Sequence, residues 1–142
     1  MAGASGPGSG AAAGYSGTPL PKKLGIVDGS TVALMGAPAG LLDDLPAGVT
    51  VKRQARGQAD VVVAFFTEQR DFERRIDALG RMIFPAGGLW VAWPKKATGV
   101  ATTMNENVLR AVALPLGLVD NKVCAIDETW SGLRVVWRRE RR

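Results

Sequence analysis

Short apolar runs alternate with helical segments along this chain, and this alternation restricts its fold more than any other feature. Residues 31–35 and 60–66 are the clearest runs, and turn residues bound each of them. Nearly continuous apolar runs of this length are typical of strands buried on both faces of a parallel sheet. With helices between the strands, the pattern predicts an α/β fold whose mostly parallel sheet is covered on both faces.

The remaining elements follow from spacing and from turn residues. A helical turn over 21–26, a short helix over 41–45 and a longer helix from Thr67 as N-cap to about Phe84 are expected. Thr103 and Glu106 have capping-box spacing and predict the start of another helix. The expected strands are residues 31–35, 49–52, 60–66, 89–93, 122–127 and 133–138, with residues 128–132 joining the last two. A connection of that length predicts an antiparallel hairpin.

The chain has the length of one domain: 142 residues. Residues 1–14 contain glycine, alanine and serine without a charged side chain, so they predict a flexible tail. Residues 15–142 are expected to form a single α/β domain. No apolar stretch reaches the roughly 18 residues that a membrane span needs.

Composition excludes several kinds of site. The sequence has no histidine and one cysteine, which excludes histidine-based triads, Cys/His zinc sites and an internal disulfide. No catalytic set, metal or cofactor is therefore expected. Cys124 lies in an apolar run and is expected to be a buried small side chain. A solitary cysteine fits the reducing cytoplasm, which is the expected location.

The charge balance favours anionic partners. Lys and Arg number 18 against 13 Asp and Glu, for a formal net charge of +5. Part of this excess belongs to Arg138, Arg139, Arg141 and Arg142 at the C-terminus. The alternative interpretation is that the charge serves solubility alone.

The closing hairpin resembles the end of the S-adenosylmethionine-dependent methyltransferase fold, in which the last strand inserts antiparallel between its two predecessors. This resemblance implies a three-layer, Rossmann-like domain with a six-stranded sheet of order 2-1-3-4-6-5, trimmed relative to that family. The family places a Gly-rich turn after strand one and an acidic residue after strand two, which holds the ribose hydroxyls. Here residues 36–40 supply the glycines, but Pro38 lacks an amide donor and residues 52–56 contain no acid. The resemblance therefore implies the fold without the methyl-donor site.

Longer stretches of the sequence resemble a bacterial family, common in actinobacteria, that is catalogued as a domain of unknown function. They are Tyr-Ser-Gly-Thr-Pro-Leu at 15–20, Leu-Trp-Val-Ala-Trp-Pro-Lys-Lys at 89–96 and the segment 112–133, which includes Asp-Glu-Thr-Trp-Ser-Gly. This resemblance implies no activity, so it bears on the fold only.

The sequence offers two candidate sites, of which the first lies at the expected carboxyl edge of the sheet. The first is an anion site, with Lys52, Arg53 and Arg56 after strand two and Lys95 and Lys96 after strand four. Helix N-termini at Thr67 and Thr103 would add positive potential there. The second is the hairpin tip, where Glu128 stands beside Trp130. The tryptophan either stacks on a ligand or partner or folds back into the core. Asp127 and Glu128 are adjacent and are expected to point to opposite faces, which argues against a paired-carboxylate site.

These observations favour a non-enzymatic binding or interaction module that recognises an anionic small molecule or a protein partner at this edge. The alternative is an enzyme with an unrecognised site built on Lys95, Lys96 and Glu128. A further alternative is nucleic-acid binding, which net charge alone supports, so nucleic acid is not the favoured partner.

Overall fold

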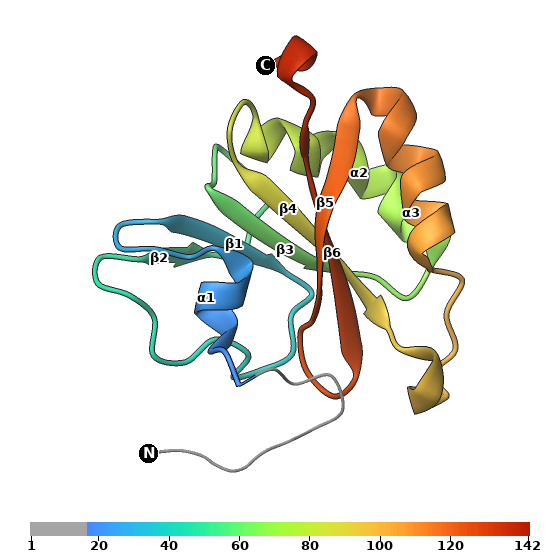
Figure 1. Ribbon diagram of the computed structural model, residues 1–142, viewed down its shortest axis with the longest axis horizontal. Helices are drawn as coiled ribbons and strands as arrows, with labels where there is room; N and C mark the ends of the chain where they lie inside the picture. The colour runs from blue at the N-terminus through green and yellow to red at the C-terminus, as the bar shows by residue number, and fades with distance from the viewer. Residues whose placement is uncertain (1–16) are drawn as a thin grey trace.

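The computed structural model describes residues 17–142, so the predicted tail over 1–14 lies outside the described residues. The sheet has six strands in the order β2-β1-β3-β4-β6-β5, as the resemblance implied (Figure 1). Strands β1 to β4 run parallel, and β6 pairs antiparallel with both β4 and β5. The strands are β1 (Thr31–Met35), β2 (Thr50–Lys52), β3 (Val61–Phe65), β4 (Gly88–Pro94), β5 (Leu118–Ala125) and β6 (Trp130–Trp137).

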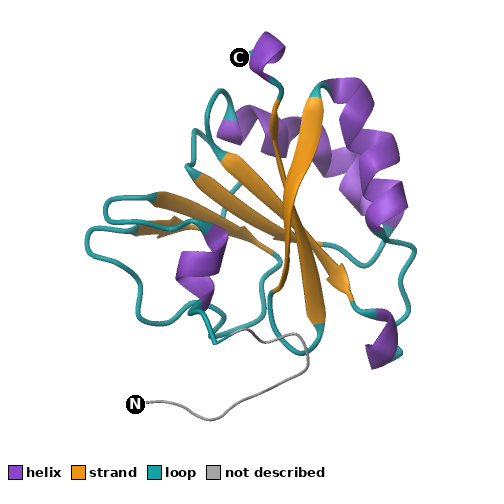
Figure 2. Cartoon of the chain, viewed as in Figure 1, coloured by secondary structure: helices purple, strands orange, loops and turns teal. Residues whose placement is uncertain are grey.

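Helices cover the two faces of the sheet unequally (Figure 2). Helices α2 (Gln69–Ile83) and α3 (Glu106–Ala113) pack on one face, over side chains such as Val62, Val91 and Leu133. The other face carries Val63, Trp90 and their neighbours, and it is covered by α1 (Leu20–Leu24) and the loop after β1. Successive strand residues point to opposite faces, so a strand such as β3 must be apolar throughout. The remaining helical segments are the short 3-10 turns η1 (Lys96–Thr98), η2 (Leu114–Leu116) and η3 (Arg139–Arg141).

Helix α1 is held on its face by Trp90, the largest of the fully buried side chains. The indole Nε1 of Trp90 donates to the carbonyl oxygen of Leu24 at 3.0 Å. Gly25, with φ 84°, ends the helix in the left-handed conformation that a side chain disfavours. The predicted helical turn is thus confirmed. No helix in the described part of the chain has both the length and the apolar character to cross a membrane.

The predicted helix over 41–45 is wrong, because the whole connection from β1 to β2 is a loop. Gly40 and Pro46 confine the stretch to about one helical turn, and so short a helix forms only where tertiary contacts such as the bond from Trp90 to Leu24 hold it. Leu41, Leu42 and Leu45 instead pack in part against the sheet from irregular backbone. The loop therefore covers this face in place of a helix.

The hairpin strands are longer than predicted. Strand β5 begins at Leu118, and β6 begins at Trp130. At the hairpin end, Ala125 pairs with Ser131, and Trp130 pairs with Pro94 of β4. The connection is residues 126–129, one residue shorter than expected. Its turn is closed by Asp127, whose Oδ1 accepts hydrogen bonds from the amides of Thr129 and Trp130.

The two predicted N-caps, Thr67 for α2 and Thr103 for α3, are also wrong. Glu68, not Thr67, is the N-cap of α2, and its side chain makes no capping bond. The first amide of that helix, Gln69 N, donates instead to Thr103 Oγ1 at 2.6 Å. Helix α3 is capped by Asn105, whose Oδ1 accepts from Val108 N at 2.8 Å. Thr103 thus caps a neighbouring helix across space, which local sequence spacing does not reveal.

The cap that Thr103 supplies to α2 has a measurable consequence. Thr103→Ala is expected to lower the free energy of unfolding by about 1 kcal/mol, the typical loss of an N-cap hydroxyl. Hydrogen exchange should quicken at the Gln69 amide and stay unchanged at Val108, which Asn105 caps. Asn105→Ala is the matched control and should produce the reverse pattern. If Thr103→Ala quickened hydrogen exchange at the Val108 amide and not at the Gln69 amide, the assignment of the cap would be wrong.

Candidate functional site

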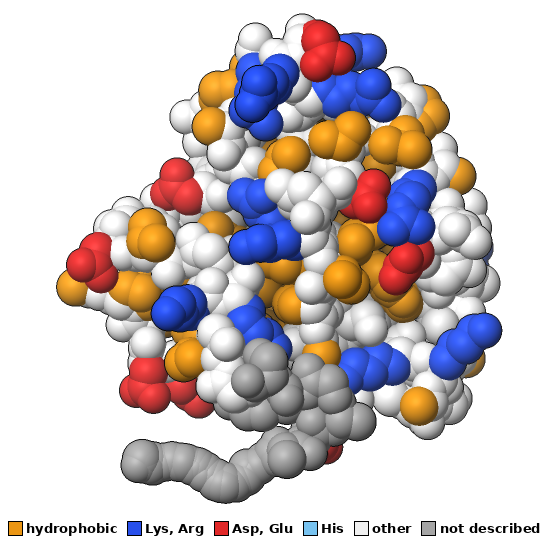
Figure 3. Space-filling model, viewed as in Figure 1, with side chains coloured by type: hydrophobic (Ala, Val, Ile, Leu, Met, Phe, Trp, Pro, Cys, Tyr) orange, Lys and Arg blue, Asp and Glu red, His pale blue; other side chains and the backbone are white. Residues whose placement is uncertain are grey.

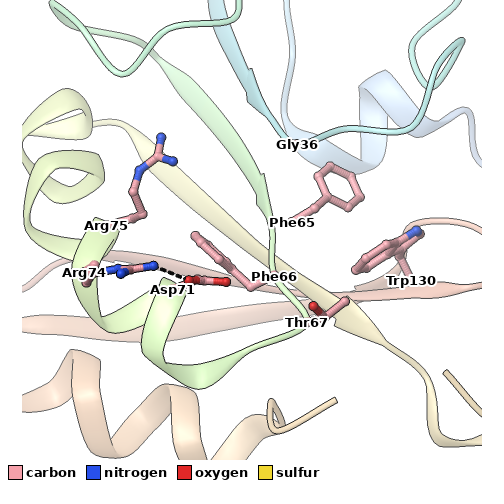
Figure 4. A pocket seen from close by; sticks show the side chains of 8 residues that line it. All are labelled: Gly36, Phe65, Phe66, Thr67, Asp71, Arg74, Arg75 and Trp130. Carbon is pink, nitrogen blue, oxygen red and sulfur yellow. Dashed lines mark hydrogen bonds and ion pairs between the residues drawn. The ribbon is translucent and has the colours of Figure 1, made fainter. Parts of the chain in front are cut away.

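A pocket of about 390 Å³ lies at the carboxyl ends of the central strands. We call it the strand-end pocket. Figure 4 shows charged side chains of α2 on one side, with Phe65 and Trp130 on the other and the end of β3 between them. Its lining residues are Gly36, Phe65, Phe66, Thr67, Asp71, Arg74, Arg75 and Trp130. Open α/β sheets bind ligands in such a crevice, outside the carboxyl ends of their strands.

The charged side of the pocket comes from the first turns of α2. Phe72 and Ile76 face the core, which leaves Asp71, Arg74 and Arg75 at the helix surface. Arg74 forms an ion pair with Asp71. Arg75 is exposed, and its Nη2 lies 3.7 Å from the sulfur of Met35, a weak acceptor. Two guanidinium groups and one carboxylate leave the pocket with an excess of positive charge.

The aromatic side of the pocket joins β3 to the hairpin. The rings of Phe65 and Trp130 meet edge to face, with centroids 5.1 Å apart and an interplanar angle of 88°. Phe65 is buried, whereas Trp130 is half-buried and keeps part of its indole at the pocket. The tryptophan packs onto the sheet and also lines the pocket, and its stacking on a ligand or partner stays a prediction.

The backbone after β3 is held by the loop that precedes α3. The carbonyl oxygen of Thr67 accepts from Thr103 N at 2.9 Å and from Thr102 Oγ1 at 2.7 Å. Together with the cap on Gln69, these bonds tie the start of α2 to that loop. The loop before α3 thereby fixes the start of the helix that carries the two pocket arginines.

The structure brings together only part of the predicted site. Thr67 and Trp130 line the strand-end pocket, and Thr103 lies beside it through its bond to Gln69. The backbone amide of Lys95 donates to the carbonyl oxygen of Thr129 at 2.8 Å, which places it next to the hairpin tip. The predicted residues outside the lining are Arg53, Lys95, Lys96, Thr103 and Glu128.

The basic residues of the predicted anion site follow strands that are not neighbours. Strand β2, which Arg53 follows, and β4, which Lys95 follows, have β1 and β3 between them. Three strand spacings amount to about 14 Å. The backbones of Arg53 and Lys95 therefore stand well apart along one edge of the sheet, and a site shared by their side chains stays a prediction. Lys52 bonds to its own loop, where its Nζ donates to the carbonyl oxygen of Arg56 at 2.7 Å.

Sequence reasoning missed Asp71, Arg74 and Arg75 as residues of the site. A usable signal was present, since the first turns of a helix that follows a central strand lie at the carboxyl edge of a parallel sheet. The acid in the pocket, Asp71, follows β3 and not β2, and it is engaged by Arg74.

The described residues offer no other obvious chemistry. Within residues 17–142, no group of three or more Asp, Glu, Cys or His side chains could hold a metal ion. Burial raises the pKa of the Cys124 thiol, and the opposing effects of Lys23 and Lys122 do not cancel it. The thiol is therefore protonated at neutral pH, although it is half-buried rather than fully buried as predicted.

Comparison with solved structures shows that the fold is that of known methyltransferases. A SAM-dependent methyltransferase from Aquifex aeolicus has a TM-score of 0.57 and 15% identity, covering 80% of this chain and 85% of that one. A ribosomal protein L11 methylase from Lactobacillus delbrueckii subsp. bulgaricus has a TM-score of 0.55 and 11% identity, covering 84% and 75%. The fibrillarin pre-rRNA processing protein of Methanococcus jannaschii has a TM-score of 0.53 and 13% identity, covering 79% and 68%.

Identities this low show the fold and nothing finer. No family model matches the chain, so its resemblance to a domain of unknown function stays a prediction. No curated protein matches it either.

Proposed function

We propose that this protein is a binding module that holds an anionic small molecule in the strand-end pocket and transfers no methyl group. The observation that carries the proposal is the pair of arginines, Arg74 and Arg75, placed opposite the half-buried Trp130 across one pocket. Its volume of about 390 Å³ lies within the usual range for small-molecule sites.

Arg75 is the group best placed to bind the anion. Within the described part of the chain, no carboxylate forms an ion pair with it. A guanidinium presents its donors in a planar fork that matches a carboxylate or phosphate. Arg74 adds a second fork once its bond to Asp71 is shared with the ligand, and the exposed edge of Trp130 supplies an apolar contact.

The residues of this chain do not fit S-adenosylmethionine. One neighbour in the comparison, a magnesium protoporphyrin IX methyltransferase from Synechocystis, is described with SAM bound. Here β2 ends at Lys52 and is followed by Arg53, so no acid stands where ribose hydroxyls need an acceptor. The loop after β1 also has no helix, which removes the N-terminal amides that such folds direct at a cofactor. We therefore derive no methyl-transfer step.

Lys95 and Lys96 extend positive charge along the same edge without lining the pocket. In this proposal they attract an anionic ligand from a distance, an effect that salt screens over about 8–10 Å. The enzymatic alternative built on these lysines and Glu128 has less support, since Glu128 is exposed at the hairpin tip.

A binding screen with variants tests the proposal. ATP, coenzyme A, glucose 6-phosphate and S-adenosylmethionine would be tested by thermal shift and then by calorimetry. We expect at least one of the three phosphorylated compounds to bind through the strand-end pocket. Arg75→Gln should then weaken its binding at least about tenfold, because a charge-assisted hydrogen bond is lost.

Arg81→Gln is the matched control, because it makes the same charge change near the far end of α2. It should leave affinity within about twofold of the original protein, apart from the general effect of net charge. If S-adenosylmethionine bound more tightly than every phosphorylated compound, with no effect of Arg75→Gln, the proposal would be wrong and the methyltransferase alternative would stand.

A further inference from the structure

A second pocket, of about 340 Å³, lies at the opposite edge of the sheet. It shares no lining residue with the strand-end pocket. Asp60, at its wall, immediately precedes β3, whereas the strand-end pocket begins where β3 finishes. The length of that strand separates the two by about 16 Å. The lining residues are Leu24, Gly25, Val27, Asp28, Gly29, Ser30, Asp60, Val61, Ala86 and Arg134.

Arg134 is the unusual member of this second pocket. It extends from β6 across the start of β4, where its guanidinium lies against the backbone of Gly88. A Cβ at position 88 would stand 2.7 Å from both Cζ and Nη2 of Arg134. A side chain at position 88 would displace the guanidinium, so Gly88 gives the arginine room to lie against the backbone of β4.

The guanidinium has no partner to balance its charge. In residues 17–142 it makes no hydrogen bond or ion pair, although Asp28 and Asp60 line the same pocket. Partial burial lowers the pKa of Arg134, with no nearby charge opposing the shift. A desolvated and unpaired cation is costly, and proteins ordinarily pair such groups.

A second cation stands directly across the hairpin. Lys122 on β5 is the register partner of Arg134, so both side chains lie on the same face of the sheet. Like charges directly opposite on a sheet are destabilising. Figure 3 shows Lys and Arg side chains gathered in the middle of this face, between α1 and the hairpin. Lys23 of α1 reaches the hairpin as well, where its Nζ donates to the carbonyl oxygen of Ala125 at 2.8 Å.

We propose that Arg134 binds the phosphate group of a small hydroxylated molecule of the sugar-phosphate class in this second pocket. The fork of Arg134 pairs with two phosphate oxygens, and Lys122, which does not line the pocket, adds to the positive potential of the same face. The carboxylates of Asp28 and Asp60 then accept hydrogen bonds from ligand hydroxyls, which suits their place on the wall. Asp60 keeps one oxygen for this purpose, since its Oδ2 already accepts from Thr31 N at 2.8 Å.

The test uses glucose 6-phosphate as the probe and Arg134→Met as the variant. The substitution keeps much of the side-chain length and removes the charge. Binding measured by calorimetry should weaken at least about tenfold, because charge-assisted hydrogen bonds are lost. In phosphate-free buffer the melting temperature of Arg134→Met should equal or exceed that of the original protein, because an unpaired half-buried cation has been removed.

Controls separate this site from the strand-end pocket. Arg75→Gln should leave the Arg134-dependent binding of glucose 6-phosphate unchanged. Loss of binding with Arg134→Met alone therefore assigns the ligand to the second pocket, and loss with Arg75→Gln alone assigns it to the strand-end pocket. In nitrogen-edited NMR spectra, glucose 6-phosphate should shift the Nε–H signal of Arg134 and the amide signal of Gly88. Arg134→Lys is the second variant; it keeps the charge without the fork and should bind with intermediate affinity.

Three results would overturn the inference. The first is equal affinity of Arg134→Met and the original protein for glucose 6-phosphate. The second is an unmoved Arg134 Nε–H signal at saturating glucose 6-phosphate. The third is Arg134-dependent binding of a short single-stranded oligonucleotide without any binding of glucose 6-phosphate, which would assign the cations to a nucleic-acid backbone instead.

Discussion

Phe72→Ala is expected to lower the free energy of unfolding by about 3–5 kcal/mol, the range for removing a fully buried aromatic side chain. Phe72 is 0% exposed and lies on the inner face of α2. Its ring packs edge-on against Phe66, with centroids 5.5 Å apart. Alanine leaves a cavity between helix and sheet that surrounding side chains fill only in part. Urea unfolding followed by circular dichroism measures the loss.

Leu114→Ala is the control for this change, because Leu114 is 38% exposed at the end of α3. It should cost less than about 1 kcal/mol, as surface truncations do. A loss below about 1 kcal/mol for Phe72→Ala would show that α2 does not pack as described. The same variant should also loosen the strand-end pocket, since Asp71, Arg74 and Arg75 flank Phe72 on one helix.

Gly87→Ala is the second substitution with a large expected effect, of about 2–3 kcal/mol lost in unfolding free energy. A Cβ at position 87 would lie 2.8 Å from the carbonyl oxygen of Ala59, 2.9 Å from that of Asp60 and 3.1 Å from that of Ile83. All three neighbours are backbone, so none can rotate away. The new methyl group must push apart the end of α2 and the chain entering β3. Thermal and urea unfolding would both report the loss.

Gly40→Ala separates this steric effect from the conformational freedom of glycine. Gly40 has φ 71° and nothing within 4 Å of the position a Cβ would take. Alanine there meets only the cost of the left-handed conformation, about 1 kcal/mol. If the two variants lost equal stability, the contact at Gly87 would not be the cause.

The two proposed sites use the same sheet in different ways. The strand-end pocket depends on side chains of a helix that follows a central strand, at the edge where open α/β sheets bind ligands. The second pocket depends on one arginine of the inserted strand β6, which reaches over Gly88 at the other edge. Both proposals therefore assign ligand binding to cations on a methyltransferase-like fold.

Residues 31–35, 60–66 and 89–93 illustrate what could be predicted locally. Their apolar runs identified three of the central strands within one or two residues at each end, because burial on both faces demands apolar side chains throughout. The sheet order came from resemblance to a family and not from periodicity. The predicted helix over 41–45 is wrong because its three leucines can pack from a loop as well as from a helix.

Thr103 and Arg134 make contacts that local sequence patterns do not predict. Thr103 carries a capping signal in sequence, yet it caps the helix that begins at Gln69. In the sequence, Arg134 is one polar residue of an alternating hairpin strand, and nothing near it indicates that its guanidinium lies against Gly88. Both depend on contacts between residues more than 30 positions apart, which no local window contains.

The sequence by itself determined the class of this protein: an α/β domain with a covered, mostly parallel sheet, a closing hairpin and no histidine chemistry. Hydrophobic periodicity and residue type suffice to predict this fold class, because the burial of each strand determines which of its side chains must be apolar. Only the tertiary structure decided which charges meet. Arg74 and Arg75 share a pocket with Trp130, whereas Arg53 and Lys95 follow strands that two others separate. Strand order sets those distances, and strand order is a property of the whole chain.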